Sequence, residues 1–398
     1  MGARCRSPTA GSPPTTPGTR PGRPPRLRSQ SGPRRDATPP ASWTDARVRY
    51  RLAVQFELSA DQEALRDAAT SLLDARSAPE AVRNVVDNGG GWDRSLWGEL
   101  VEQGWAAVVV PEDLGGLGLG WVEGAVLMEA VGAHVAPVPI LGQLVALDAV
   151  ARAGETDWLE RLLAGDAIAA VTHRPLPASG STVPVPYLLS ADVLVAPTDA
   201  GRLVLVDLEG AEVEALPAMD LTRELGRLDV DSLTRVDLGG PDAIEAFLDA
   251  GAVAVSAELL GAAARCLDDT VAYARDRVQF GRPIGSFQAV KHRCADMLVD
   301  VEGMRSTTWW AAWCLAAQDP ERSVAASTAK IWTSDAADRV LNSALQVHGG
   351  IGFTWECDVH LYLKRVQLDR GWFGSATEHQ DRLAGMLRQR VESGEPVI

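Results

Sequence analysis

Apolar residues recur at helical spacing in the first structured part of the chain, which starts near residue 56. Ser59 can cap a helix in which Leu65, Ala69 and Leu72 fall on one face. Similar spacing predicts further helices over residues 95–103, 121–132, 141–153 and 157–164. Between them, residues 108–118 are too rich in glycine for a helix interior and predict a tight loop. We therefore expect a helical domain over residues 53–165.

The hydrophobic period shortens toward two between residues 166 and 240. This alternation predicts short strands at residues 167–172, 191–196, 202–208 and 227–236, separated by turns rich in Pro, Gly and Asp. We expect a small β domain over residues 166–240.

Long helical patterns return after residue 240. They predict helices at residues 243–279, 286–318, 323–347 and 376–392 and a helical domain over residues 241–392. The order of helices, strands and helices indicates a multidomain α+β protein with separate α and β units. A TIM barrel or a Rossmann fold would need strand and helix to alternate, so both folds are excluded.

The first 52 residues differ from the rest in composition. They are dense in Pro, Arg, Ser and Gly and have no hydrophobic periodicity, which predicts a disordered tail. The density of proline does not favour an amphipathic transit peptide, and no apolar signal-peptide core follows. A tail that arises from an over-extended reading frame is the alternative.

Charge and cysteine usage limit the possible partners and the compartment. The net charge of −15 leaves no basic face for nucleic acid outside the first fifty residues, and it gives no attraction for an anionic membrane. No apolar run approaches the roughly 18 consecutive residues of a membrane-spanning helix. The five cysteines are scattered, with no metal-ligand spacing, so we expect no metal site and a reducing, cytoplasmic compartment.

The stretch from Arg275 to Gln288 is the most informative part of the chain. It ends one predicted helix, turns at Gly281 and Pro283, and starts another helix. Such a corner can present an arginine outward. Arg277 is either a cation that is favourable at a helix carboxyl end or a group that binds phosphate through charge-assisted hydrogen bonds. The residues alone leave both interpretations open.

A second candidate segment runs from Leu345 to Glu356 and breaks a predicted helix at Gly349 and Gly350. Adjacent glycines allow a ligand to approach the backbone closely, although a helix C-cap also explains them. For His348 we favour a structural or cofactor-edge role over proton transfer. The chain shows no Walker A loop, no GxGxxG after a strand, no HExxH and no Ser-His-Asp order, so kinase, Rossmann dehydrogenase, zinc protease and hydrolase functions lack their usual support.

Taken together, these segments resemble the acyl-CoA dehydrogenase family. The resemblance is carried by Arg277, Phe280-Gly281, Pro283-Ile284, Phe287-Gln288, Ala295-Asp296-Met297, Gln346-x-His348-Gly349-Gly350 and, in the first domain, Pro111-Glu112-Asp113-Leu114-Gly115-Gly116. It covers residues 56 to about 390. It implies three domains: a helical one, a small β-barrel-like one and a C-terminal four-helix bundle.

The resemblance implies an FAD enzyme that oxidises an acyl-CoA thioester to the trans-2-enoyl-CoA. A glutamate removes the α proton, the β hydrogen leaves as hydride to the flavin, and an electron-transferring flavoprotein takes the electrons. The residues that would contact the adenosine-diphosphate part of FAD are Arg277, Phe280, Gln288, Gln346, Val347, His348, Gly349 and Gly350. In the family such residues typically reach the flavin of a neighbouring subunit, which implies an oligomer.

The chain departs from the family at the catalytic base. Counting from Arg365 in the last helical segment places Gly374 where many relatives carry the glutamate, and glycine cannot abstract a proton. Some relatives place the base on the first long helix of the last domain, where an ungapped alignment gives Gly251. The remaining acidic candidates are Asp249, Glu258 and Glu378, although Glu258 and Glu378 also read as helix-surface charges.

A second departure lies in the β domain, where residues 171–177 lack the family's Thr-Glu-Pro and Gly-Ser segment that meets the flavin ring. We therefore expect a non-catalytic subunit of a heteromeric bacterial enzyme, which completes FAD binding for a partner that supplies the base. Bacterial members that act on steroid side-chain thioesters resemble this arrangement. A self-sufficient homo-oligomer with a relocated acidic base, and a scaffold that binds no flavin, are the alternatives.

Overall fold

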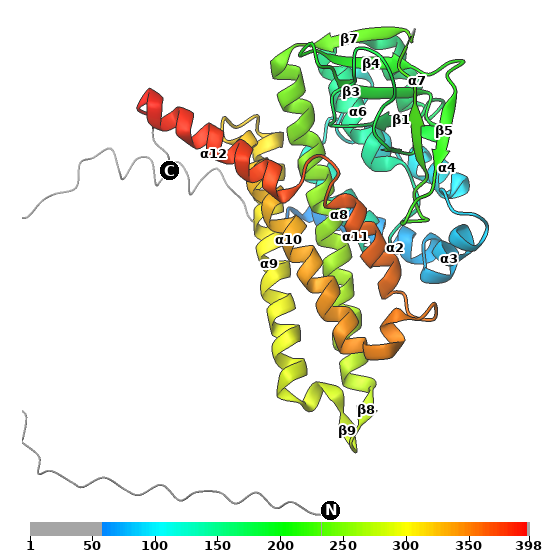
Figure 1. The fold of residues 1–398 in the computed structure, drawn as a ribbon, viewed down its shortest axis with the longest axis vertical. Helices are drawn as coiled ribbons and strands as arrows, with labels where there is room; N and C mark the ends of the chain where they lie inside the picture. The colour runs from blue at the N-terminus through cyan, green and yellow to red at the C-terminus, as the bar shows by residue number, and fades with distance from the viewer. Residues whose placement is uncertain (1–57, 232, 396–398) are drawn as a thin grey trace, which may run out of the picture. The chain divides into compact units, whose positions relative to one another are not determined.

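The computed structural model describes residues 58–231 and 233–395, and the tail predicted at residues 1–52 lies outside them. The described chain runs through helices, then strands, then helices again (Figure 1). This order confirms the predicted α+β class, although the domain boundaries themselves stay predictions.

The first helices are α2 (Ala60–Arg76), α3 (Pro79–Asp87), α4 (Arg94–Glu102), α5 (Trp121–Ala133), α6 (Ile140–Ala153) and α7 (Thr156–Leu163). Ser59 caps α2 as expected: its hydroxyl accepts from the backbone of Gln62, and the Gln62 side chain accepts from the Ser59 backbone. The hydrophobic pattern did not predict α3, a nine-residue helix that begins at Pro79. The glycine-rich residues 108–118 form a tight loop that holds one short 3₁₀ helix, Glu112–Leu114.

Seven short strands follow. They are β1 (Ala169–Val171), β2 (Val185–Pro186), β3 (Val193–Pro197), β4 (Leu203–Asp207), β5 (Val213–Leu216), β6 (Leu225–Leu228) and β7 (Arg235–Gly239). One sheet has the order β1-β3-β4-β7, with β1 and β3 parallel and the other pairs antiparallel, and an antiparallel sheet has the order β2-β6-β5. The single strand predicted at residues 227–236 was wrong, because β6 and β7 belong to different sheets; β2 and β5 were missed.

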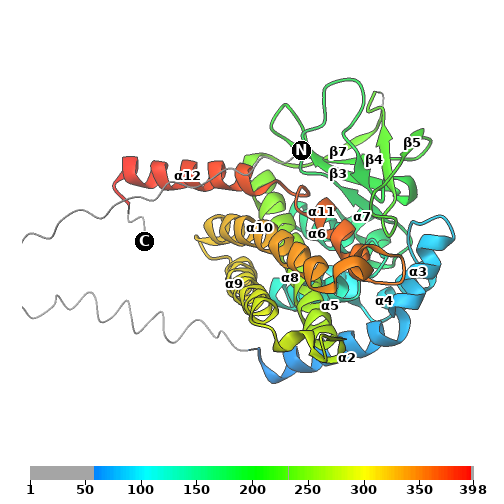
Figure 2. The same cartoon turned by 60° about the horizontal axis from the view of Figure 1, so that its bottom comes forward.

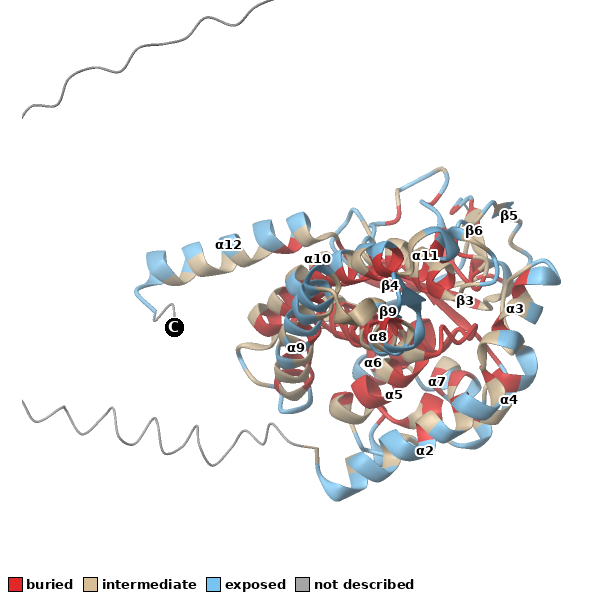
Figure 3. Ribbon diagram, turned by 90° about the horizontal axis from the view of Figure 1, so that it is seen from below, coloured by how far each residue is buried: buried red, intermediate tan, exposed pale blue. Residues whose placement is uncertain are grey.

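The last part contains α8 (Pro241–Asp276), α9 (Gln288–Ala316), α10 (Arg322–His348), α11 (Val359–Asp369) and α12 (Ala376–Ser393). Helices α8, α9 and α10 pack against one another, and α11 packs on α8 and α10, as the predicted bundle requires. Helix α12 contacts α10 and extends away from the bundle (Figure 2). It is exposed or partly exposed along most of its length, with His379 buried (Figure 3).

Helix α8 is long and apolar enough to cross a membrane, with a mean hydropathy of 1.5 over its most apolar window. However, 89% of that window is buried inside the described fold, as expected for a central core helix. It was not singled out from the sequence, because charged residues interrupt its apolar run.

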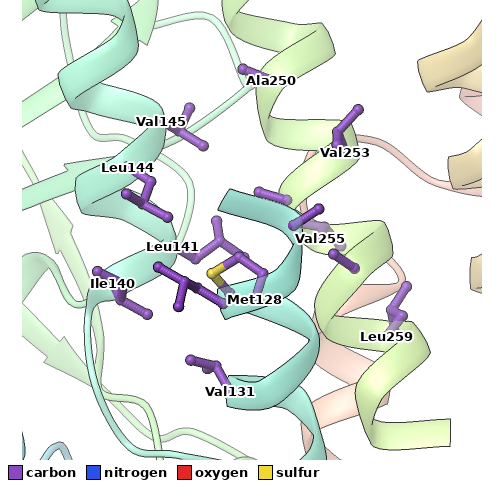
Figure 4. Packing of buried hydrophobic residues seen from close by; sticks show 14 of the residues in the cluster. Met128, Val131, Ile140, Leu141, Leu144, Val145, Ala250, Val253, Val255 and Leu259 are labelled. Carbon is purple, nitrogen blue, oxygen red and sulfur yellow. The ribbon is translucent and has the colours of Figure 1, made fainter. Parts of the chain in front are cut away.

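The core between the first helices and the bundle is formed by α5, α6 and α8 (Figure 4). Met128 of α5, Leu144 of α6 and Val255 of α8 are fully buried there. Two glycines allow α5 and α8 to approach closely: a Cβ on Gly132 would lie 2.0 Å from the Glu258 carbonyl oxygen, and one on Gly261 would lie 1.9 Å from that of Glu129. The two helices therefore cross with their backbones in contact.

Candidate functional site

The first cofactor-binding candidates lie at the end of α8. The helix ends at Asp276 with Arg277 as its C-cap, three residues before the predicted end. Strands β8 (Val278–Gln279) and β9 (Arg282–Pro283) then form a small hairpin at the lower end of the bundle (Figure 1). Phe280 sits at its turn with a φ of 54° and is 93% exposed. A phenylalanine so fully exposed in a left-handed turn is available to a ligand or a partner.

The second group lies beside the first. Helix α10 ends at His348, whose ring stacks on Tyr273 of α8 with 4.4 Å between ring centroids. This contact brings the ends of α8 and α10 together, as the two sequence motifs require. Gln288, Gln346 and Gly350 are exposed, His348 and Gly349 are half-buried, and the side chain of Val347 is buried in the bundle.

Two features of this end fit an anionic ligand. Within residues 58–231 and 233–395, the Arg277 guanidinium has no ion-pair or hydrogen-bond partner, so its donors are free for a phosphate. Gly350 has an ordinary backbone conformation, and a Cβ added to it would meet nothing within 4 Å. The packing of this chain does not require a glycine there, which leaves room for close contact with a ligand. We call this surface, formed by Arg277, Phe280, Gln288, Gln346 and Gly350, the cofactor corner.

Gly374, where the resemblance predicts the base, lies in the loop between α11 and α12 rather than in a continuous helix. The nearby acid Glu378 forms the capping box of α12 with Ser375 and an ion pair of 2.5 Å with Arg174. Although partial burial opposes the shift, hydrogen bonds from Ser375 and Arg174 lower the pKa of Glu378 to about 2. Glu378 is therefore a cap and a very weak base.

Asp249 is fully buried on α8, where it accepts from Ser323 at 2.6 Å and pairs with Arg382 of α12 at 2.7 Å. Burial raises the pKa of this carboxyl above its usual value. Asp249 lies two residues from Gly251 and hence about 200° around the helix from it. The Asp249 side chain therefore points toward α12, on the side of α8 opposite to Gly251.

Glu258 is fully buried, so its interpretation as a helix-surface charge was wrong. Its carboxylate accepts from Arg223 at 2.6 Å and from Arg365 of α11 at 2.6 Å. Arg365 also pairs with Asp220 at 2.8 Å, and Arg223 also pairs with Asp369. This buried ionic network joins the segment before β6 to α8 and α11. The Glu258 carboxylate is thus occupied by two guanidinium groups.

Lys330 holds the loop that follows α11. It is fully buried on α10, and its ammonium donates to the carbonyl oxygens of Asp369, Arg370 and Gly374 at 3.2, 3.1 and 2.8 Å. Burial lowers the pKa of Lys330 to about 7. The position of Gly374 is therefore set by a side chain from another helix, a contact that no local sequence pattern predicts.

The space over Gly251, one of the two predicted base positions, is filled by Phe373. Its ring is 2% exposed, and a Cβ on Gly251 would lie 2.0 Å from it. The ring also lies 5.4 Å from Phe247 and 5.9 Å from His173 between centroids. Neither Gly251 nor Gly374 faces a carboxylate that could act as a base.

The neighbouring residues hold the backbone of this loop. The Phe373 amide donates to His173 Nδ1 at 3.1 Å, and His379 Nε2 donates to the Phe373 carbonyl at 2.7 Å. The Trp372 indole donates to the carbonyl oxygen of Val171, at the end of β1, at 3.4 Å. The sequence predicts no role for these residues; the contacts of His173 and Val171 join positions 200 and 201 residues apart, and that of His379 joins positions six apart.

The described residues contain no group of His, Cys, Asp and Glu side chains that could hold a metal ion. Cys266, Cys294, Cys314 and Cys357 are free thiols. A separate surface cavity of about 540 Å³ lies between the glycine-rich loop and the ends of α6 and α9, lined by Trp121, Asp148, Arg152 and Leu315 among others. It holds none of the predicted site residues.

Comparison with known proteins places these features in a family. The acyl-CoA dehydrogenase N-terminal domain matches residues 59–166 and the C-terminal domain matches residues 239–386. Acyl-CoA dehydrogenase IpdE2 of Mycolicibacterium smegmatis is 36% identical over 82% of this chain and 98% of its own length. Acyl-CoA dehydrogenase FadE27 of Mycobacterium tuberculosis is 32% identical over 80% of this chain and 95% of its own length.

Solved structures agree. The ChsE4–ChsE5 complex of Mycobacterium tuberculosis matches with a TM-score of 0.77 at 31% identity, over 84% of this chain and 99% of the matched chain. A variant of the Tcur3481–Tcur3483 steroid acyl-CoA dehydrogenase matches with a TM-score of 0.77 at 30% identity, over 83% and 99%. Together with the family matches at both ends of the fold, these similarities show that the chain belongs to the acyl-CoA dehydrogenase family.

Proposed function

We propose that this chain is the non-catalytic subunit of a heteromeric acyl-CoA dehydrogenase, which completes the FAD site of a homologous partner. The reaction is the α,β-dehydrogenation of an acyl-CoA thioester, in which the bound FAD supplies the acceptor for the hydride. The carboxylate that removes the α proton belongs to the partner in this proposal. An electron-transferring flavoprotein then takes the electrons.

The observation that carries the proposal is the free guanidinium of Arg277 on the exposed cofactor corner. It has the reach and charge to bind a phosphate of the cofactor. The ring of Phe280, 93% exposed, offers a flat face to the same ligand. These groups point away from the chain's own core, which fits a cofactor that is held mainly by another subunit.

The base positions support the same division of roles. Gly251 and Gly374 carry no carboxylate, Glu258 is held between two arginines, and Glu378 is a helix cap. A dehydrogenation that starts with proton abstraction needs a free base within reach of the α carbon. Because this chain offers none among those candidates, we assign the base to the partner.

The similar proteins suggest the partner and substrate classes. One of the matched structures is a complex of two differently named chains, and another is named as a steroid acyl-CoA dehydrogenase. We therefore propose a homologous acyl-CoA dehydrogenase subunit as the partner and a steroid side-chain thioester as the substrate. The free thiols fit the cytoplasm as the compartment.

The test is cofactor retention in the co-expressed complex with a homologous partner, measured as flavin absorbance between about 350 and 500 nm per complex. Arg277→Ala removes the proposed phosphate contact and is expected to lower bound FAD by roughly tenfold or more. Arg275→Ala is the matched control, because Arg275 is an exposed arginine in the last turn of the same helix. It is expected to keep the wild-type FAD content.

The outcomes separate the alternatives. Equal FAD loss in both variants would mean that only general charge matters, and no loss in either would overturn the assignment of the cofactor corner. If the chain purified alone is yellow and bleaches with acyl-CoA, it is a self-sufficient enzyme with its own base. If neither the chain nor any complex binds flavin, it is a scaffold.

A further inference from the structure

The loop Gly371–Ser375 carries a feature that the absence of a base does not require. A subunit without a base could leave an empty pocket in its place. Instead, Trp372 and Phe373 turn into the fold and are 5% and 2% exposed. Their ring centroids lie 6.0 Å apart, and we call the two side chains the aromatic plug.

The first half of the plug covers Gly251. The three atoms nearest to a Cβ placed on Gly251 all belong to the ring of Phe373, at 2.0, 2.0 and 2.4 Å. No side chain larger than hydrogen fits at position 251 while the ring stays in place. The Phe373 ring therefore occupies the space that a side chain at position 251 of α8 would otherwise fill.

The second half of the plug covers the end of β1. The Trp372 indole donates to the Val171 carbonyl, and the same ring stacks against the Arg223 guanidinium, whose carbon lies 4.9 Å from the ring centroid. In this way a backbone oxygen that begins the segment of residues 171–177 is already paired within the chain.

The conformation of Phe373 shows that the plug is held in place. Its φ is 56°, a left-handed value that costs a non-glycine residue roughly 1 kcal/mol or more. Hydrogen bonds from both sides secure this backbone: His173 accepts from its amide, and His379 donates to its carbonyl. Lys330 holds the next carbonyl, that of Gly374, at 2.8 Å.

We propose that the aromatic plug closes this chain's own acyl pocket, so that an acyl-CoA thioester cannot enter between α8 and the loop that follows α11. This inference rests on the proposed function, because it takes Gly251 and Gly374 as the counterparts of the base positions. It adds that the chain is closed to the substrate by specific side chains rather than only lacking a base.

Titration of the 398-residue chain with octanoyl-CoA, by calorimetry, tests the plug. The wild-type chain is expected to show no saturable binding, whereas Phe373→Ala opens the pocket and binds the thioester at least about tenfold more tightly. Phe373→Leu keeps most of the apolar volume and is the matched control, with binding close to that of the wild type. Saturable binding of one octanoyl-CoA by the wild-type chain, or equal binding by all three proteins, would overturn the proposal.

A stability cycle keeps the proposal testable if the opened pocket does not bind this thioester. Gly251→Ala is expected to lower the midpoint of thermal unfolding of the wild-type chain clearly, since its Cβ would meet the ring. In the Phe373→Ala background the same change is expected to leave the midpoint unchanged or raise it. Additive effects would show that the ring does not fill this space, and the plug would then be wrong. FAD retention in the Arg277 variants does not depend on either result, so failure here is distinguishable from failure of the proposed function.

Discussion

At the scale of single residues, two histidines hold the backbone of the loop before α12 through hydrogen bonds to Phe373. His173 can accept the Phe373 amide only when Nδ1 is unprotonated, and His379 can donate to the Phe373 carbonyl as the neutral Nε2–H tautomer. Burial, together with Arg174 for His173, lowers the pKa of each histidine to about 4. Both rings are therefore neutral in the folded protein at neutral pH.

A pH dependence of stability follows from these values. An unfolded histidine titrates near 6.5, so between about pH 6.5 and 4 the unfolded chain binds protons that the folded chain does not bind. Stability is expected to fall as pH falls through this window, by up to about 3 kcal/mol for His379. Urea unfolding at several pH values measures the effect.

The variant His379→Gln isolates this contribution, since its amide can still donate to the Phe373 carbonyl but does not titrate. The loss of stability between pH 6.5 and 4 should be smaller in this variant than in the wild type. An identical pH profile in both proteins would show that His379 is not held neutral. The carboxylates, which also titrate in this window, are common to both proteins.

The sequence predicts Gly374 and Gly251 at the base positions, but it could not show which side chain covers Gly251. A glycine at a predicted base position means that the carboxylate is missing, and the residue type alone shows this. The inward rotation of Phe373 depends on a positive φ and on His173, which is 200 residues away. No local pattern carries that information.

At the scale of elements, the two motifs of the cofactor corner lie at neighbouring helix ends, but the predicted end of α8 was wrong. The helical pattern of α8 was extended to residue 279, whereas the chain turns into the β8–β9 hairpin after Arg277. The short helices α3 and α11 were also missed as separate elements, because each spans only two or three turns. Local periodicity identifies long helices better than their ends.

The second glycine of the motif offers a test at this scale. Gly350→Ala is expected to leave the stability of the chain unchanged within about 0.5 kcal/mol, because its Cβ meets nothing within 4 Å. In the complex with a partner it should lower FAD retention, since the methyl group takes the space of the ligand. Both quantities can be measured on the same preparation by thermal unfolding and flavin absorbance.

Gly98→Ala on α4 is the control for that experiment, because its Cβ also meets nothing within 4 Å and it lies outside the cofactor corner. It should change neither FAD retention nor the assembly with the partner. Undiminished FAD in the Gly350→Ala complex would mean that the cofactor does not approach this backbone.

At the scale of the whole molecule, the buried ionic network connects residues that lie 35 to 146 positions apart in the sequence. Arg223 comes from the β region, Glu258 from α8 and Arg365 from α11, and all three are at most 1% exposed. Charges at this depth are stable only when they are paired. The order of the domains could be predicted from hydrophobic periods, but this connection could not, because isolated charges read as surface residues.

Glu258→Gln tests the structural role of this network. It keeps the shape of the side chain but leaves two buried guanidinium groups with one carboxylate fewer, so the free energy of unfolding is expected to fall by about 3 kcal/mol or more. Glu245→Gln, a half-exposed glutamate on the same helix, should change it by less than about 0.5 kcal/mol. If Glu258→Gln kept full stability and abolished turnover of the complex, Glu258 would have to be reconsidered as the base.

The close crossing of α5 and α8 limits how the first helices can move against the bundle. Gly132 and Gly261 place each helix backbone directly against the other, with no side chains between them whose rotamers could adjust. A hinge or sliding motion of the first helices against the bundle would have to separate two backbones and expose the core around Met128. The crossing of α5 and α8 therefore opposes a large closure of the first helices over the bundle. A ligand at the cofactor corner would therefore enter and leave without such a closure.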